Sequence, residues 1–223
     1  MRFPTWAKAL VTGLGLAAVS APAWAGQTFT VTGVSLASNA DTVQLDTPVG
    51  ASTWAGPVLL STSIGNLVTW CIDIYADIYL GSGQSLTYQT NAVTTSTQNG
   101  NGVTLTATQV QEIQGLAGYG SSLYAANPND ADDLAAVQLA IWSVEYSTFS
   151  YSGTSANVVS LTNADIANAG NLTGSATELD SQSGTQNFVT TSVPEPISAA
   201  LLGSGLAALG LVLRRRATTA RTA

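Results

Sequence analysis

The sequence predicts an α+β domain, with strands mainly in the N-terminal half and a helical segment in the middle of the chain. Three observations lead to this prediction. Runs rich in β-branched and aromatic residues recur between residues 28 and 75. Apolar residues at helical spacing recur between residues 108 and 146. Uncharged apolar stretches lie near both ends of the 223-residue chain and are typical of targeting segments rather than of a folded core.

Four segments of the first half have the composition of strands. The strongest is 67–75, which is rich in β-branched and aromatic residues and should be largely buried. Because side chains alternate along a strand, Cys71, Asp73 and Tyr75 should point to one face. The other three expected strands are 28–34, 42–45 and 57–64.

Helices are expected in the middle of the chain. The first covers 108–117 and should end near Gly118. The second covers 134–146, and the aspartates between residues 130 and 133 precede it, where carboxylates interact favourably with the helix dipole. A short helix is expected at 164–169. The strand that carries Cys71 should therefore pack near the helix that carries Gln138.

The chain is expected to divide into four segments. These are a signal peptide, a secreted domain, a Ser/Thr-rich linker and a C-terminal sorting signal. Their boundaries are 1–25, 26–170, 171–192 and 193–223.

The distribution of charge excludes several classes of function. The net charge is −7, the chain has no His, and no Lys or Arg occurs between Lys8 and Arg214. A body without cations cannot neutralise a phosphate backbone, so nucleic acid is not an expected partner. Catalysis through His or Lys is excluded, and one Cys without any His offers no zinc site. We expect no metal, no cofactor and no enzymatic turnover.

The N-terminus has the order of a secretory signal peptide. Arg2 and Lys8 form a basic tip, and an apolar stretch follows at 9–19. The small residues Ala23 and Ala25 then provide a cleavage site after residue 25. A membrane anchor is the alternative, but the apolar stretch is short for one.

The C-terminal region has the order of a membrane anchor. Residues 197–213 are apolar and uncharged, and as a helix they would span about 25 Å, enough to cross a bilayer. The arginines that follow should stay in the cytoplasm, so the polar bulk of the chain would lie outside the inner membrane. These stop-transfer residues are Arg214, Arg215 and Arg216.

A Pro-Glu-Pro motif precedes this helix. Together with the apolar helix and the Arg cluster it resembles the PEP-CTERM sorting signal of Gram-negative bacteria. The resemblance implies recognition by an exosortase-type processing enzyme, removal of the anchor, and transfer of the mature protein to the cell surface or the extracellular matrix. It also implies a link with exopolysaccharide and biofilm. The motif consists of Val193, Pro194, Glu195 and Pro196.

Two residues do not fit ordinary core positions. Gln138 lies in the middle of a mainly apolar helix face, and a buried amide without a partner costs about 1–3 kcal/mol. Taken singly, Cys71 is explained as a small buried hydrophobe and Gln138 as a core amide bonded to backbone. Taken together, the pair suggests a thioester between the Cys71 sulfur and the Gln138 side-chain carbonyl, formed with loss of ammonia. The helix face consists of Leu134, Gln138, Ile141, Trp142 and Glu145.

The sequence around this pair resembles the thioester domain of bacterial surface adhesins. The resemblance lies in Trp-Cys-Ile-Asp at 70–73 and in Val-Gln-Leu-Ala-Ile-Trp at 137–142. The family pattern usually has Thr where this chain has Val137. The resemblance implies a Cys71–Gln138 bond that a nucleophile on a partner opens, which leaves the domain covalently attached to an extracellular polysaccharide or a surface protein. Asp73 and Glu145 are candidates for moving protons in these steps.

Other interpretations remain open from the sequence. In the first, the protein is a non-reactive structural or carbohydrate-associated matrix protein, and Cys71 and Gln138 only pack. In the second, Asp73 and Asp77 serve as the paired carboxylates of a glycoside hydrolase. The acidic segment 127–133 could supply oxygen ligands for Ca²⁺, although helix capping explains it without a metal.

Overall fold

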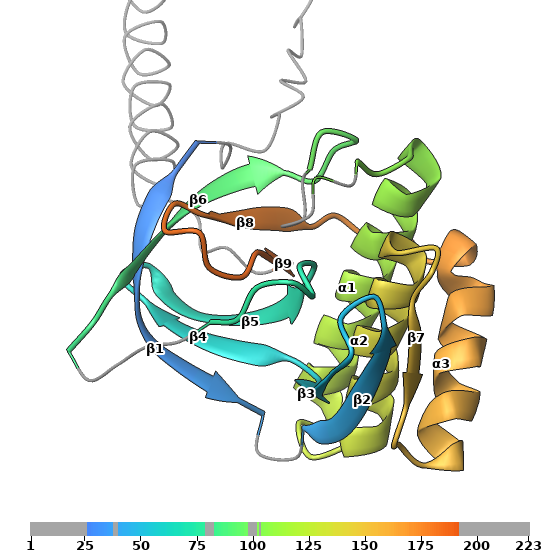
Figure 1. The fold of residues 1–223 in the computed structure, drawn as a ribbon. Helices are drawn as coiled ribbons and strands as arrows, with labels where there is room; N and C mark the ends of the chain where they lie inside the picture. Colours follow the sequence, from blue (N-terminus) through green and yellow to red (C-terminus); the bar gives the residue numbers. More distant parts are fainter. Residues whose placement is uncertain (1–25, 38–39, 79–82, 98–101, 103, 192–223) are drawn as a thin grey trace, which may run out of the picture.

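The computed structural model describes residues 26–37, 40–78, 83–97, 102 and 104–191 (Figure 1). The expected signal peptide, the motif from Val193 to Pro196, the apolar segment 197–213 and the Arg cluster lie outside the described residues. Within the described part of the chain, no helix combines the length and apolar character needed to cross a membrane.

A closed antiparallel barrel forms one half of the fold, in the order β1-β4-β5-β9-β8-β6 (Figure 1). Its strands alternate between buried and exposed side chains; in β1, for example, Phe29 and Val31 are buried. The strand bounds are β1 Thr28–Leu36, β4 Val58–Thr62, β5 Gly65–Cys71, β6 Leu86–Ala92, β8 Thr177–Ser181 and β9 Phe188–Thr190.

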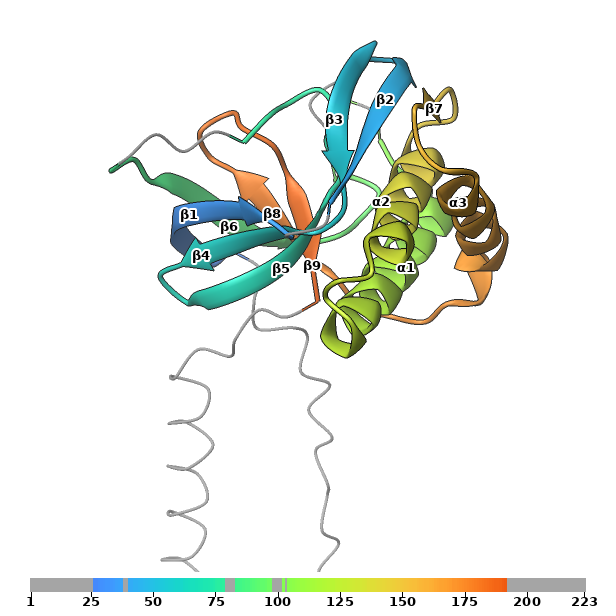
Figure 2. The ribbon, with the colours of Figure 1, turned by 90° about the horizontal axis from the view of Figure 1, so that it is seen from below.

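A separate sheet of order β3-β2-β7 lies beside the barrel and against helix α2 (Figure 2). Strands β2 and β3 both contact helix α2. Strand β2 is central in this sheet, so β3 is one of its edges. The bounds are β2 Asp41–Thr47, β3 Ala51–Ala55 and β7 Ser150–Ser152.

The helices form a layer beside the barrel, with α2 between α1 and α3 (Figure 2). Each begins at a side-chain cap: Thr106 forms a capping box with Gln109, and Asp130 and Ser155 each accept a backbone N–H. Because α2 contacts both helices and both sheets, it is buried on nearly all sides. The bounds are α1 Ala107–Ala126, α2 Ala131–Glu145, α3 Ala156–Asn168 and a 3₁₀ turn at Ala169–Asn171.

The structure confirms the prediction of strands in the first half and a helical middle. It corrects the end of the first helix, which continues past Gly118 to Ala126. Glycine is needed inside this helix because a Cβ on Gly120 would lie 2.5 Å from Cζ2 of Trp70. The glycines therefore allow α1 to approach β5 closely and do not end the helix.

The prediction that 171–192 is a linker is wrong for most of that segment. It contains β8 and β9, and both strands are needed to close the barrel. Leu179, Phe188 and Val189 are fully buried there. A Ser/Thr-rich composition concealed these strands, because their polar residues alternate with few apolar ones. The expected short helix at 164–169 is the end of the longer α3.

Candidate functional site

Cys71 is the last residue of β5 and its side chain belongs to the apolar interior of the barrel. It is 5% exposed. Its neighbours Trp70 and Ile72 belong to the second core cluster, between the barrel and the helices. Because side chains alternate along a strand, the Cys71 sulfur lies on the barrel side and the Trp70 ring lies on the helix side.

The side-chain amide of Gln138 is held against the backbone of Cys71 by two hydrogen bonds. The Cys71 N–H donates to Oε1 of Gln138 at 2.9 Å, and Nε2 of Gln138 donates to the Cys71 carbonyl oxygen at 2.9 Å. Gln138 is fully buried. The sequence predicted these two residues as a pair, and the structure brings them together.

The Gln138 amide lies where Cys71 has no partner on the neighbouring strand β4. Strand β4 begins at Val58, which pairs with Thr69, so Cys71 extends beyond the start of β4. The Gln138 amide occupies the position that a peptide group of a neighbouring strand would otherwise take. Without it, two buried backbone groups would each lose a partner, at about 1–3 kcal/mol for each group.

Carboxylates surround the cysteine. Burial raises the pKa of the Cys71 thiol far above its ordinary value, and the negative charges of Asp73, Glu145 and Asp77 raise this pKa further. Asp73 and Glu145 are themselves buried. The structure therefore brings both predicted proton-handling residues close enough to Cys71 to affect its titration.

The segment after Cys71 corrects one prediction. Strand β5 ends at Cys71, so Asp73 and Tyr75 do not continue the strand face as expected. Asp73 instead accepts the Tyr75 N–H on Oδ1 at 2.9 Å, a side-chain turn that competes with extended backbone. The carbonyl oxygen of Asp73 accepts from Nε2 of Gln186 at 3.1 Å, which ties this segment to the β8–β9 connection.

A cavity of about 510 Å³ opens beside Cys71. Its walls come from the end of β1, the middle of β3, the start of β4, the segment after β5, helix α2 and the β8–β9 connection. A smaller cavity of about 130 Å³ adjoins it and shares five lining residues with it. The larger cavity is lined by Val34, Ser35, Leu36, Ser52, Thr53, Trp54, Val58, Cys71, Asp77, Ile78, Trp142 and Gln186.

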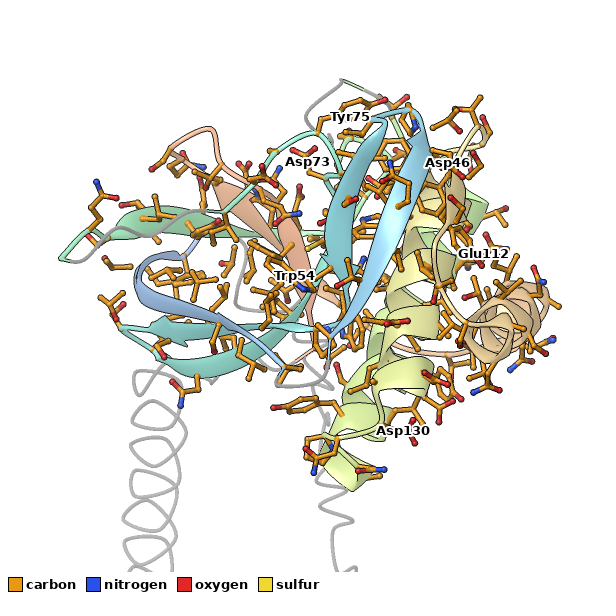
Figure 3. All side chains as sticks on the ribbon, turned by 60° about the horizontal axis from the view of Figure 1, so that its bottom comes forward. Asp46, Trp54, Asp73, Tyr75, Glu112 and Asp130 are labelled. Atoms are coloured by element: carbon orange, nitrogen blue, oxygen red, sulfur yellow. The ribbon has the colours of Figure 1, made fainter. Side chains whose placement is uncertain are left out.

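Sequence reasoning missed most of these lining residues. Trp54 and Gln186 reach the site from segments far away in the sequence, and their local sequence contains no signal of this contact. Trp142 was predicted on the same helix face as Gln138 and does line the cavity. Its indole N–H is buried and has no hydrogen-bond partner among the described residues. Figure 3 shows Trp54 between β3 and the barrel.

The other predicted sites have simpler roles. Asp130 caps α2 by accepting the Asp133 N–H. Oδ1 of Asn127 accepts the Asn129 N–H, so the acidic segment is a turn and a helix cap. Within the described ranges, no group of three or more His, Cys, Asp or Glu residues is arranged to hold a metal ion. Asp77 lines the cavity and the buried Asp73 does not, so this cavity presents only one of the two carboxylates of the hydrolase hypothesis.

Comparisons with known proteins add one structural likeness. No protein-family model matches the sequence, and no curated protein matches it. The fold is similar to the N-terminal thioester domain of a surface protein from Clostridium perfringens, with a TM-score of 0.46 and 14% sequence identity. The match covers 74% of this chain and 98% of that domain.

Proposed function

We propose that Cys71 and Gln138 form an internal thioester, through which an exported bacterial protein attaches covalently to a partner. The observation that supports this most directly is the pair of hydrogen bonds that fixes the Gln138 amide on the backbone of Cys71. The cavity beside Cys71 supports it as well, because a partner nucleophile needs a route to the bond.

Formation of the thioester requires an exchange at one carbon. The Cys71 sulfur attacks Cδ of Gln138, the bond from Cδ to Nε2 breaks, and the thiol proton leaves with Nε2 as ammonia. The Cys71 N–H already donates to Oε1, which is the oxygen that gains negative charge during the attack. In this proposal Asp73 and Glu145 carry the proton from sulfur to nitrogen.

Opening of the thioester attaches the partner. A primary amine or hydroxyl attacks Cδ of Gln138, the bond from Cδ to sulfur breaks, and the proton of the nucleophile passes to sulfur. Because burial raises the pKa of Cys71, the sulfur leaves as a thiol rather than as a thiolate. Each domain reacts once, so this is covalent attachment and not enzymatic turnover.

Export and sorting complete the proposal. Residues 1–25 direct export across the inner membrane, residues 197–213 hold the chain there, and an exosortase-type enzyme cleaves near Pro194. The mature protein then belongs to the cell surface or matrix of a Gram-negative bacterium. In support, β9 ends at Thr190, so the folded barrel reaches almost to the Pro-Glu-Pro motif in the sequence.

A second candidate function is a passive structural or carbohydrate-associated matrix protein. The same two hydrogen bonds favour it, because they are the bonds an intact Gln138 amide makes to satisfy a strand end. In that case the cysteine is a small apolar core residue. The two candidates differ in one covalent bond, and its presence can be measured directly.

The test is the intact mass of the purified, non-reduced full chain beside its Cys71→Ala variant. With a thioester, the wild type is lighter than its sequence by the mass of one ammonia molecule, and the variant is not. Methylamine should then replace the deficit by an adduct on Gln138 and release one thiol. A wild type of full mass, whose thiol reacts once the protein is unfolded, would contradict the thioester and leave the passive function.

A further inference from the structure

The cavity beside Cys71 has the form of a slot between the end of β1 and the middle of β3. One wall is three consecutive residues of β1 and the other is three consecutive residues of β3. Cys71 and Trp142 contribute to the lining between them. Consecutive residues from two strands line a space that runs along the strands, which suits an extended chain. The wall residues are Val34, Ser35 and Leu36 from β1, and Ser52, Thr53 and Trp54 from β3.

Strand β3 presents an open edge. In its sheet, β2 covers one side, and no strand among the described residues pairs with the other side. The open edge of a strand carries backbone N–H and C=O groups that can pair with another chain. Trp54 on this strand is 57% exposed, and Leu36 at the end of β1 is 36% exposed. Large exposed apolar side chains of this kind are frequent anchors for a partner.

The charge of the slot selects the side chain that enters it. Asp77 is the carboxylate that lines it, and its charge acts on the Cys71 thiol. No Lys or Arg occurs anywhere between Lys8 and Arg214 to compensate these acidic residues. A cationic segment is therefore complementary to the slot.

We infer that the partner enters as an extended, lysine-bearing peptide segment that adds as a strand to the open edge of β3 and presents its lysine at Cys71. This inference rests on the proposed thioester and names the partner and the way it docks. Strand addition gives affinity through main-chain hydrogen bonds, and selectivity through pockets for alternate side chains. The lysine is then the side chain of the added strand that is directed to Cys71, which lines the slot.

The chemistry of coupling balances with these groups. The lysine ammonium gives one proton to Asp77, and the neutral amine attacks Cδ of Gln138. The bond from Cδ to sulfur breaks, a second proton passes from nitrogen to sulfur, and the products are an amide and the Cys71 thiol. The methylene chain of the lysine passes between apolar walls that include Val58 and Ile78.

The first test uses a blocked peptide of alternating threonine and valine with one central lysine, added to the full chain. Two further peptides carry backbone N-methyl groups on alternate residues. In one peptide the methylated residues are the lysine and every second residue from it, and in the other they are the residues between these. Because a strand edge pairs with alternate residues only, one N-methylated set should lower the coupling rate by about tenfold or more, and the other should react like the parent. Blocked lysine alone should couple more slowly than the parent peptide. Equal rates for both N-methylated sets, or for blocked lysine and the peptide, would overturn strand addition.

The controls separate this inference from the thioester itself. Methylamine opening in the same preparation shows whether the thioester exists. If it does not, the peptides are tested for non-covalent binding to the Cys71→Ala variant by calorimetry, and the same dependence on the N-methyl position is expected. Trp54→Ala should lower the rate of the peptide reaction severalfold relative to the rate of methylamine opening measured on the same variant, while Ile166→Ala, at an exposed position on α3, should leave this ratio unchanged. An ester adduct with cellotetraose, without any peptide adduct, would overturn the inference in favour of a carbohydrate partner.

Discussion

Two adjacent rows of side chains cross strands β5, β9 and β8, and each row carries one buried ionisable group. The inner row faces the interior of the barrel and pairs Cys71 with Phe188 and Phe188 with Leu179. The outer row faces the helices and pairs Trp70 with Val189 and Val189 with Glu178. The two rows are one residue apart along each strand, yet they face opposite cores.

The two groups are stabilised in different ways. The backbone of Cys71 is satisfied by the amide of Gln138, and its side chain lines a cavity. The carboxyl of Glu178 accepts a hydrogen bond from the Thr97 hydroxyl at 3.1 Å and is 5% exposed. Burial raises the pKa of Glu178 to about 7, and the Thr97 hydrogen bond partly opposes this. The inner row thus places a thiol beside a cavity and its backbone against a buried amide, whereas the outer row places a titratable carboxyl beside one hydroxyl partner.

The largest expected effect comes from removing Gln138. Compared with the protein that has an intact Gln138 amide, Gln138→Ala leaves the Cys71 N–H and carbonyl buried without these partners and opens a cavity beside α2, so we expect a loss of about 3–5 kcal/mol in the free energy of unfolding. Urea denaturation measures this loss. Cys71→Ala is the matched control, because it removes any thioester and keeps the backbone groups that Gln138 satisfies. A loss for Gln138→Ala no greater than that for Cys71→Ala would show that the two hydrogen bonds do not stabilise the strand end.

Thr97→Val makes the corresponding change in the outer row. It removes the hydroxyl that donates to Glu178 and keeps the shape of the side chain, and it should cost about 1–2 kcal/mol. The difference between the two rows is thus expected to be severalfold. Equal losses at Gln138 and Thr97 would contradict the distinction drawn between them.

Gly120→Ala tests the packing that places the inner row. The added methyl would lie 2.5 Å from Trp70 and 2.7 Å from Cγ1 of Val137, so α1 must move away from β5. We expect a loss of about 1–3 kcal/mol in unfolding free energy, measured by thermal or urea denaturation. Gly118→Ala is the matched control, because its methyl meets Gly174 at an ordinary 3.7 Å. Since alanine favours a helix over glycine, this control should be neutral or stabilising by up to about 1 kcal/mol.

The outer row should make stability depend on pH. The folded-state pKa of Glu178 is raised from 4.5 to about 7, so the folded protein holds this proton more tightly than the unfolded chain. The stabilisation of the folded state by this proton is therefore complete below pH 4.5 and declines as the pH rises to about 7. On the order of 2–3 kcal/mol should be lost over this range. Glu178→Gln should remove that part of the decline.

Asp165 provides the control for this pH dependence. Burial, and then the charge of Asp133, raise its pKa to about 6, so it contributes in the same direction over a lower pH range. Asp165 is only partly buried, so its contribution should be smaller. Urea denaturation midpoints of Glu178→Gln and Asp165→Asn, measured from pH 4.5 to about 7, separate the contributions of the two carboxyl groups. An unchanged pH profile in Glu178→Gln would show that this carboxyl is solvated.

The sequence predicts the inner row better than the outer one, for a physical reason. Cys71 lies on a run of β-branched and aromatic residues and Gln138 on a continuous apolar helix, so each element is defined by its own residues. Glu178 lies in Thr-Glu-Leu-Asp-Ser, where a single apolar residue is too little to reveal a strand. The Phe-Val-Thr run of β9 was a usable signal, but it is very short.

Most of the cavity could not be predicted from the sequence. Its residues come from segments that only the packing of the barrel, the second sheet and helix α2 brings together, such as Trp54 on β3 and Gln186 before β9. Closure depends on strand pairing over long sequence separations, which no local pattern encodes. The acidic turn before α2 is the opposite case, since helix capping is local and was predicted correctly.

The smallest expected effect concerns the missing lysines. If the inner row carries a thioester, a body without lysine cannot form an amide through a lysine of another copy of itself. Asn66→Lys places an amine at an exposed position of the β4–β5 hairpin. In concentrated protein this variant should slowly form a minor fraction of dimers that resist reducing agents, because the new bond is an amide. Asn66→Gln and Asn66→Lys combined with Cys71→Ala should both stay monomeric on a reducing denaturing gel. The inserted lysine does not lie on a free extended segment, so the yield of dimer should fall well below the yield with the lysine peptide. An Asn66→Lys protein that has an intact thioester and stays monomeric would contradict this expectation.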